Sequence, residues 1–189
     1  MKFNNQYYIL RHGKAVSNEQ RIVSSHPEKF ENSLTDEGRE QIKNVVVEIE
    51  KLNIDLIFAS DLLRTKQTAE IIADTLKLEI IFDKRLREID MGIFNGGPED
   101  AWNEFYECEA QRFVKKPKDG GENYREVKER AKDFIGDIDK KYKGKNILIV
   151  SHGCVLFSMQ VIVGGQTEEQ EMSCRNNLVM KNGELKKLN

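Results

Sequence analysis

Short apolar runs recur along the chain, and polar or turn-forming residues flank each of them. Runs of this kind are typical of buried β-strands. They predict strands over residues 7–10, 55–60, 79–82 and 146–150. The end of the chain carries two further β-type stretches, NLVM and ELKKLN, on either side of Asn182-Gly183. Because an Asn-Gly pair favours a tight turn, we expect a final hairpin at the sheet edge.

Between the predicted strands, apolar residues recur with the spacing of one helix face. Two such faces lie over residues 42–49 and 69–76, and a third lies over 124–138. Gly144 follows the third face as a stop signal. Strand and helix in alternation predict an α/β fold, a three-layer domain whose mainly parallel sheet has helices on both faces.

The length of 189 residues suits one domain with a sizeable core, so we expect a single domain over 1–189. Its least regular stretch, about 92–121, contains Gly96-Gly97-Pro98, Lys115-Lys116-Pro117-Lys118 and Gly120-Gly121. Long irregular stretches inside a compact domain are commonly functional. We therefore predict that residues 92–121 form a small inserted cap or lid.

Composition and charge narrow the classes of function. The chain is 39% hydrophobic and 33% charged with a formal net charge of −2, which favours a soluble globular protein without general attraction for nucleic acid or membranes. No apolar run approaches the roughly 20 residues that span a bilayer, and the first residues lack a signal-peptide core, so we expect a cytoplasmic protein. The cysteines, Cys108, Cys154 and Cys174, have no CxxC spacing and favour neither a disulfide framework nor a zinc site.

Two histidines come directly after predicted strands. His12 follows the strand ending at Leu10, and His152 follows the strand ending at Val150; each is followed by glycine, in RHG and SHG. Ligands of open α/β sheets bind at the carboxyl ends of the strands. A glycine at such a position lets the backbone turn and a ligand approach the main chain. The repeated pattern predicts that both histidines lie in one site.

Two arginines and a glutamate follow strands in the same way. Arg64 lies in the first turn of the helix that Ser60 or Asp61 could cap, where a guanidinium and free N–H groups favour an anion. With Arg11 it could bind a phosphate through paired hydrogen bonds; the alternative, which is the more common state of a lone arginine, is a surface ion pair. Glu88 follows the third strand and suits a general acid beside a dianion, with a salt-bridged loop residue as the alternative.

These residues belong to an ordered set of motifs. RHG at 11–13 and Asn18 are followed by SLTDEG at 33–38, SDLLRTKQTA at 60–69, LREIDMGIFNG at 86–96, GGEN at 120–123 and SHG at 151–153. In this order the chain resembles the histidine phosphatase superfamily, the phosphoglycerate-mutase-like proteins. The resemblance covers nearly the whole chain and implies the phosphoglycerate-mutase-like fold.

The resemblance also implies roles for individual residues. His12 is expected to be the nucleophile that forms a phosphohistidine, Glu88 the proton donor, and Arg11, Arg64 and His152 the groups that hold the phosphoryl oxygens. Because these cations supply the charge, neither a metal nor another cofactor is expected. Substrate contacts are expected from Asn18, Glu122, Gly153 and Cys154, the last two through main-chain N–H groups. His26 matches no motif and is expected at the surface.

The resemblance leaves the reaction and the substrate open. The chain reads RHGKA where RHGES or RHGET is common, and the segment between Glu88 and His152 is shorter than in the mutases it resembles. We expect a phosphomonoester phosphatase acting on a small phosphorylated metabolite; the alternatives are a phosphoglycerate-mutase-type phosphotransferase and an inactive module that binds phosphorylated ligands. The sequence also leaves open whether the protein forms a homodimer. Aromatic residues of the cap could line a substrate pocket or pack on the core: Trp102, Phe105, Tyr106 and Phe113.

Overall fold

The computed structural model describes residues 3–189, apart from the side chain at position 176. Within that range the strands form a five-stranded sheet in the order β3-β2-β4-β1-β5. The strands are β1 (Gln6–Arg11), β2 (Leu56–Ala59), β3 (Ile80–Phe82), β4 (Asn146–Ser151) and β5 (Leu185–Lys187). β1 to β4 are parallel, and β5 runs antiparallel to β1. The predicted mainly parallel sheet is confirmed.

The central strands are buried on both faces, which explains their continuous apolar sequences. Along β4, Ile147 and Ile149 face one hydrophobic cluster, whereas Leu148 and Val150 face the other. This alternation follows from the two-residue period of a strand. The register pairs Arg11 of β1 with Ser151 of β4. Both strands therefore end at the same level, and the residues that follow them emerge side by side.

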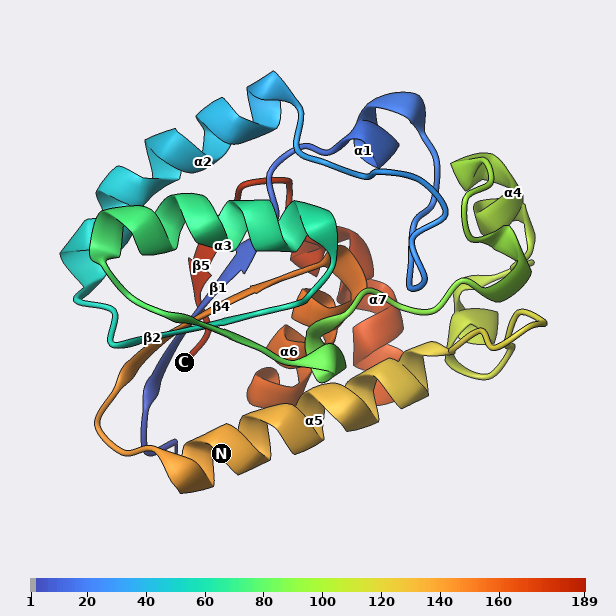
Figure 1. The fold of residues 1–189 in the computed structure, drawn as a ribbon. Helices are drawn as coiled ribbons and strands as arrows, with labels where there is room; N and C mark the ends of the chain where they lie inside the picture. The colour runs from blue at the N-terminus through green and yellow to red at the C-terminus, as the bar shows by residue number, and fades with distance from the viewer. Residues whose placement is uncertain (1–2) are drawn as a thin grey trace.

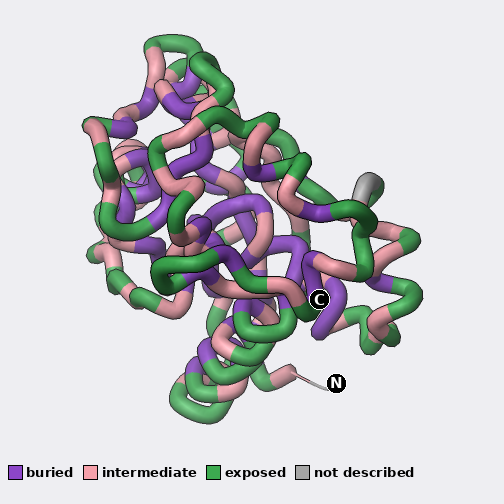
Figure 2. Tube along the Cα trace, turned by 90° about the vertical axis from the view of Figure 1, so that its right-hand side faces the viewer, coloured by how far each residue is buried: buried purple, intermediate pink, exposed green. Residues whose placement is uncertain are grey.

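Helices cover both faces of the sheet (Figure 1). On one face lie α2 (Asp36–Ile49) and α3 (Leu63–Leu76), and on the other lie α5 (Tyr124–Lys141) and α6 (Gly153–Gly164). Figure 2 shows the buried residues concentrated in the interior, with exposed residues along the outer turns. The three-layer α/β fold is confirmed. None of the helices in the described range is long and apolar enough to span a membrane.

The predicted terminal hairpin is wrong. The stretch NLVM does not form a strand: its first two residues end α7 (Glu168–Leu178), which a Thr167–Gln170 capping box starts. The antiparallel partner of β5 is β1 rather than a neighbouring strand of a hairpin. The turn itself exists, because Gly183 adopts a φ of +71°, but it joins β5 to the loop after α7. Neither α6 nor α7 was predicted.

The segment predicted as a cap lies to one side of the sheet, beside α1 (Val16–Gln20) (Figure 1). It contains α4 (Glu99–Glu104) and 3-10 turns at Gly92–Phe94 and Glu109–Phe113; two further 3-10 turns lie at Glu50–Leu52 and Lys84–Leu86. Backbone hydrogen bonds of 2.8 and 2.9 Å join residues 21–23 to residues 96–99. Its aromatic residues largely pack on one another, and Trp102 is only 5% exposed. This segment therefore forms a packed wall beside the carboxyl ends of the strands.

Candidate active site

β1 and β4 bring His12 and His152 together, with ring centroids 5.2 Å apart and both side chains buried. The glycine after His12 has a structural reason. A Cβ on Gly13 would lie 2.5 Å from the carbonyl oxygen of Gly38, and one on Gly38 would lie 2.0 Å from that of Lys14. The two glycines let the start of α2 approach the RHG loop. The RHG and SLTDEG motifs thus contact each other through their backbones, and each motif supplies one of the two glycines.

Hydrogen bonds define the orientation of the His12 ring. Its Nδ1 lies 2.8 Å from the carbonyl oxygen of Gly13, which can only accept, so Nδ1 carries the hydrogen. The Nε–H of Arg64 donates to the other nitrogen, Nε2, at 3.2 Å. Burial lowers the pKa of His12 well below its ordinary value, and the charges of Arg64 and Arg11 lower it further. His12 is therefore neutral, with an unprotonated Nε2.

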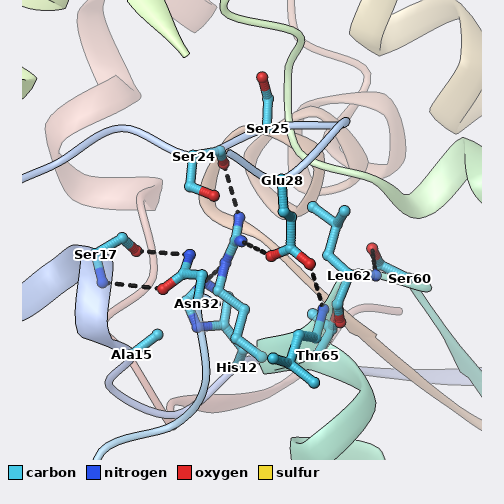
Figure 3. Close-up of polar contacts among 12 residues, drawn as sticks. His12, Ala15, Ser17, Ser24, Ser25, Glu28, Asn32, Ser60, Leu62 and Thr65 are labelled. Carbon is cyan, nitrogen blue, oxygen red and sulfur yellow. Dashed lines mark hydrogen bonds and ion pairs between the residues drawn. The ribbon is translucent and has the colours of Figure 1, made fainter. Parts of the chain in front are cut away.

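Arg64 is 3% exposed, and each of its nitrogens has a partner. Besides His12, it donates to the carbonyl oxygen of Ser24 at 3.0 Å and to Glu28 at 3.3 Å. The other oxygen of Glu28 accepts the Leu63 N–H at the start of α3, at 3.0 Å (Figure 3). Burial lowers the pKa of Arg64 to about 10, which leaves it charged at neutral pH. Glu28 thus holds both Arg64 and the start of the helix that carries it.

The predicted cap of α3 is corrected in detail. Leu62 is the N-cap residue, and Ser60 accepts only the Leu62 N–H, through Oγ at 3.3 Å. Asp61 instead forms a bidentate ion pair with Arg87, with both distances 2.6 Å. Sequence reasoning did not find Glu28, because it lies far from Arg64 in the chain and in a loop without a motif.

His152 presents a free ring nitrogen. Its Nε2 lies 2.9 Å from Ser60 Oγ, and Nδ1 is buried without a partner among the described residues. Burial, followed by Arg64, lowers the pKa of His152 well below its ordinary value, so the ring is neutral. Since Ser60 already accepts the Leu62 N–H, its own hydroxyl can donate to Nε2. Nδ1 then carries the hydrogen and can donate to a phosphoryl oxygen.

Arg11 and Glu88 complete the set around His12. Arg11 donates from Nη1 to the carbonyl oxygen of Met180 at 2.6 Å, while its buried Nε has no partner in the described range. Glu88 accepts the Cys154 N–H at 3.3 Å. This amide, which we expected to contact the phosphate, donates to Glu88. Gly153 lies against the Arg11 guanidinium, where an added Cβ would be 3.5 Å from Cζ.

A cavity of about 330 Å³ lies against most of these groups, whereas the fully buried His152 does not line it. Its wall includes Arg11, His12, Asn18, Arg64, Glu88 and Asn182. Asn18 uses Oδ1 to accept both the Ala15 N–H at 3.0 Å and the Asn182 side-chain N–H at 3.2 Å, so its Nδ2 is left to face a ligand. Asn182 also donates to the His12 carbonyl oxygen at 3.2 Å. Sequence reasoning treated Asn182 only as a turn residue, although an asparagine near the sheet edge is also a candidate ligand.

Glu122 lies apart from His12. It forms a bidentate ion pair with Arg130 at 2.9 and 3.0 Å and accepts the Asp90 N–H at 2.9 Å. Together with the exposed His26 it lines a second hollow of about 320 Å³, which meets the first at Glu88. Its contact with the Asp90 N–H holds the loop that carries Glu88. No group of three or more His, Cys, Asp or Glu side chains within residues 3–189 is arranged to hold a metal ion.

A neutral histidine between two arginines, at the carboxyl ends of parallel strands, defines an enzyme of phosphoryl transfer. The chain belongs to the histidine phosphatase superfamily (branch 1), whose family model matches residues 7–180. It is 36% identical over 155 residues to the "Probable phosphoglycerate mutase GpmB" of an Enterobacter species. The aligned residues cover 80% of this chain and 71% of the relative.

Solved structures of the superfamily share the fold. Bacillus stearothermophilus YhfR superimposes with a TM-score of 0.83 at 25% identity, over 96% of this chain and 89% of that one. The alpha-ribazole phosphatase of Shigella flexneri superimposes with a TM-score of 0.78 at 23% identity, over 95% and 88% of the two chains. The phosphoglycerate-mutase-like fold expected from the motifs is confirmed.

Proposed function

We propose that this protein is a metal-independent phosphatase that hydrolyses a small phosphomonoester through a phosphohistidine at Nε2 of His12. The observation that carries the proposal is the orientation of that ring. The Gly13 carbonyl oxygen holds the hydrogen on Nδ1, which leaves the Nε2 lone pair on the side of Arg64. A neutral, oriented imidazole is what attack on phosphorus requires.

In the first step, Nε2 attacks phosphorus, the P–N bond forms, and the bond to the ester oxygen breaks. Arg11, Arg64 and the free nitrogen of His152 hold the other phosphoryl oxygens and stabilise their charge. Glu88, in its protonated form, transfers its proton to the departing oxygen, so the product leaves as an alcohol. The fixed cations do here what a metal ion does in other phosphatases.

In the second step, water attacks the phosphohistidine. The carboxylate of Glu88 takes a proton from that water, the P–N bond breaks, and its electron pair returns to Nε2. Inorganic phosphate leaves, and Glu88 is again protonated for the next cycle. One residue thus acts first as acid and then as base.

A phosphomonoester panel assayed with a chelator tests the proposal. We expect hydrolysis that survives the chelator and falls by on the order of 10⁴-fold in His12→Ala, as for loss of other nucleophiles. His26→Asn, which changes an exposed histidine outside the His12 cavity, is the matched control. Failure to hydrolyse any ester of the panel would overturn the proposal.

A mutase is the second candidate, because the similar bacterial proteins carry the name phosphoglycerate mutase. A mutase keeps its phosphohistidine from water while the substrate reorients. Trapping the labelled phosphoenzyme and following its decay separates the two reactions. Label that passes to water supports the phosphatase; label that is stable in water and passes to phosphoglycerate supports the mutase.

A further inference from the structure

A second cavity of about 230 Å³ adjoins the cavity of His12. We call it the leaving-group chamber and define it by the side chains of Trp102, Tyr124, Phe157, Arg175 and Val179. The walls of the two cavities share residues, among them Arg11, Glu88 and Glu99. The two spaces therefore meet where the proposed proton donor lies.

The proposed reaction indicates which part of the substrate would lie in this chamber. Glu88 protonates the ester oxygen as it departs, so the leaving group must lie on the side of the phosphoryl group that faces Glu88. The chamber begins there and extends beneath α4 toward α6 and α7. The inference thus rests on the proposed function and concerns the alcohol part of its substrate.

The walls of the chamber suit a flat apolar group. Three of its side chains are aromatic, and Trp102, Tyr124 and Phe157 are each at most 5% exposed. The Cys154 thiol also reaches the wall, and burial raises its pKa to about 12, so it is neutral. An engineered apolar cavity of about 150 Å³ binds benzene, so the chamber has room for one ring.

Charge in the chamber opposes a second anionic group. The cations that line the two cavities are Arg11, Arg64 and Arg175. The first two face the phosphoryl group, and Arg175 is paired with Glu109 at 3.3 Å and donates to the Tyr124 hydroxyl at 3.2 Å.

At the boundary of the two cavities lies the exposed Glu99, which faces both; Glu88, also at this boundary, is protonated in the step that releases the leaving group. The cap lysines Lys115 and Lys116 contact Phe105 and Glu126 instead of either cavity. A carboxylate or second phosphate on the leaving group would share the boundary of the two cavities with Glu99, while Arg175, the chamber's own cation, already has partners in Glu109 and Tyr124.

We propose that the leaving-group chamber selects phosphomonoesters of an uncharged, ring-bearing alcohol over esters that carry a second anionic group. Three esters with similar alcohol chemistry test this: benzyl phosphate, para-carboxybenzyl phosphate and ethyl phosphate. We expect kcat/KM for benzyl phosphate to exceed each of the others by at least about tenfold, from ring burial and charge repulsion.

The outcomes separate this inference from the function on which it rests. Equal kcat/KM for the three esters, or a preference for para-carboxybenzyl phosphate, overturns the inference while leaving the phosphatase intact. Absence of hydrolysis with these esters and with the wider panel overturns the phosphatase itself.

Charge reversal at the exposed Glu99 tests whether charge repulsion contributes to the selectivity, without changing a core residue. Glu99→Lys should raise the ratio of kcat/KM for para-carboxybenzyl over benzyl phosphate by roughly tenfold. Asp100→Lys is the matched control, because Asp100 is the exposed neighbour of Glu99 and lines neither cavity. An unchanged ratio in Glu99→Lys, or an equal change in both variants, overturns the charge argument.

Truncation of an aromatic wall tests the ring site. Trp102→Leu should lower kcat/KM for benzyl phosphate by about tenfold more than it lowers kcat/KM for ethyl phosphate. Phe105→Leu is the control, because Phe105 packs in the same aromatic cluster and lines neither cavity. A loss that is equal for both esters would contradict a ring site at Trp102.

Discussion

The Nε–H of Arg64 donates a hydrogen bond to Nε2 of His12 across 3.2 Å, so the arginine proposed to bind phosphate also contacts the proposed nucleophile. A phosphoryl group that enters the cavity must take over this hydrogen bond before Nε2 can attack. The other two nitrogens of the guanidinium keep their partners on the loop of residues 24–28. The arginine can therefore exchange one partner without losing its position.

Glu28→Gln tests how far this anchor matters. The change removes the negative charge that faces Arg64 and leaves one oxygen to serve both Arg64 and the Leu63 N–H. Hydrogen bonds to charged groups contribute about 1.5–3 kcal/mol, so we expect kcat/KM to fall by roughly 10- to 100-fold. Glu31→Gln, an exposed carboxylate of the same loop, should leave it unchanged. Wild-type kcat/KM in Glu28→Gln would refute the positioning role.

The buried histidines should make stability depend on pH. Their pKa values in the folded protein lie well below the ordinary 6.5, so below that pH the unfolded chain binds more protons than the folded one. Each neutral histidine contributes fully to the free energy of unfolding above pH 6.5. Below that pH this contribution is lost by about 1.4 kcal/mol per pH unit.

Urea unfolding between pH 7 and 5 measures this slope. Replacing His152 with Asn removes one of the two groups, so the free energy of unfolding should fall less steeply than in the wild type. His26→Asn, a substitution at an exposed histidine, is the control for the change of residue type. Identical slopes in wild type and His152→Asn would contradict the proton linkage.

Two glycine substitutions should have opposite effects on stability, because Gly38 lies in the contact between the RHG loop and α2 and Gly136 has open space beside it. Gly38→Ala places a Cβ 2.0 Å from the Lys14 carbonyl oxygen and should destabilise the fold by about 3 kcal/mol or more. Gly136→Ala, in α5, meets nothing within 4 Å and should stabilise it by roughly 1 kcal/mol through helix propensity. Chemical unfolding measures both changes. A neutral Gly38→Ala would mean that the loop and helix do not need this approach.

Asn182→Ala tests the asparagine that sequence reasoning missed. The variant loses the hydrogen bonds to Asn18 and to the His12 carbonyl oxygen, so Asn18 is free to rotate. A neutral hydrogen bond contributes about 0.5–1.5 kcal/mol, so loss of the bond that orients Asn18 should lower kcat/KM by roughly 3- to 10-fold, mainly through KM. Asn177→Ala, at an exposed position in α7, is the control. An equal loss in both variants would point to general destabilisation.

The sequence by itself determined the strands, the helices α2, α3 and α5, and the placement of RHG and SHG at the ends of two strands. These are local signals, because apolar spacing reports burial and a strand's end is marked by the residues that follow it. The register of β1 and β4 then brings His12 and His152 together. That register is favoured by two apolar strands buried on both faces, which explains why a pairing of distant residues could be predicted.

Only the tertiary structure decided the partners that orient these residues. Glu28 reaches Arg64, Asn182 reaches Asn18, and the Cys154 amide binds Glu88, each across a long stretch of chain. Such contacts depend on the paths of loops, which no periodic pattern encodes. The hairpin failed for the same reason: NLVM has β-type composition, but the capping box of α7 and the open edge of β1 determined where the chain went.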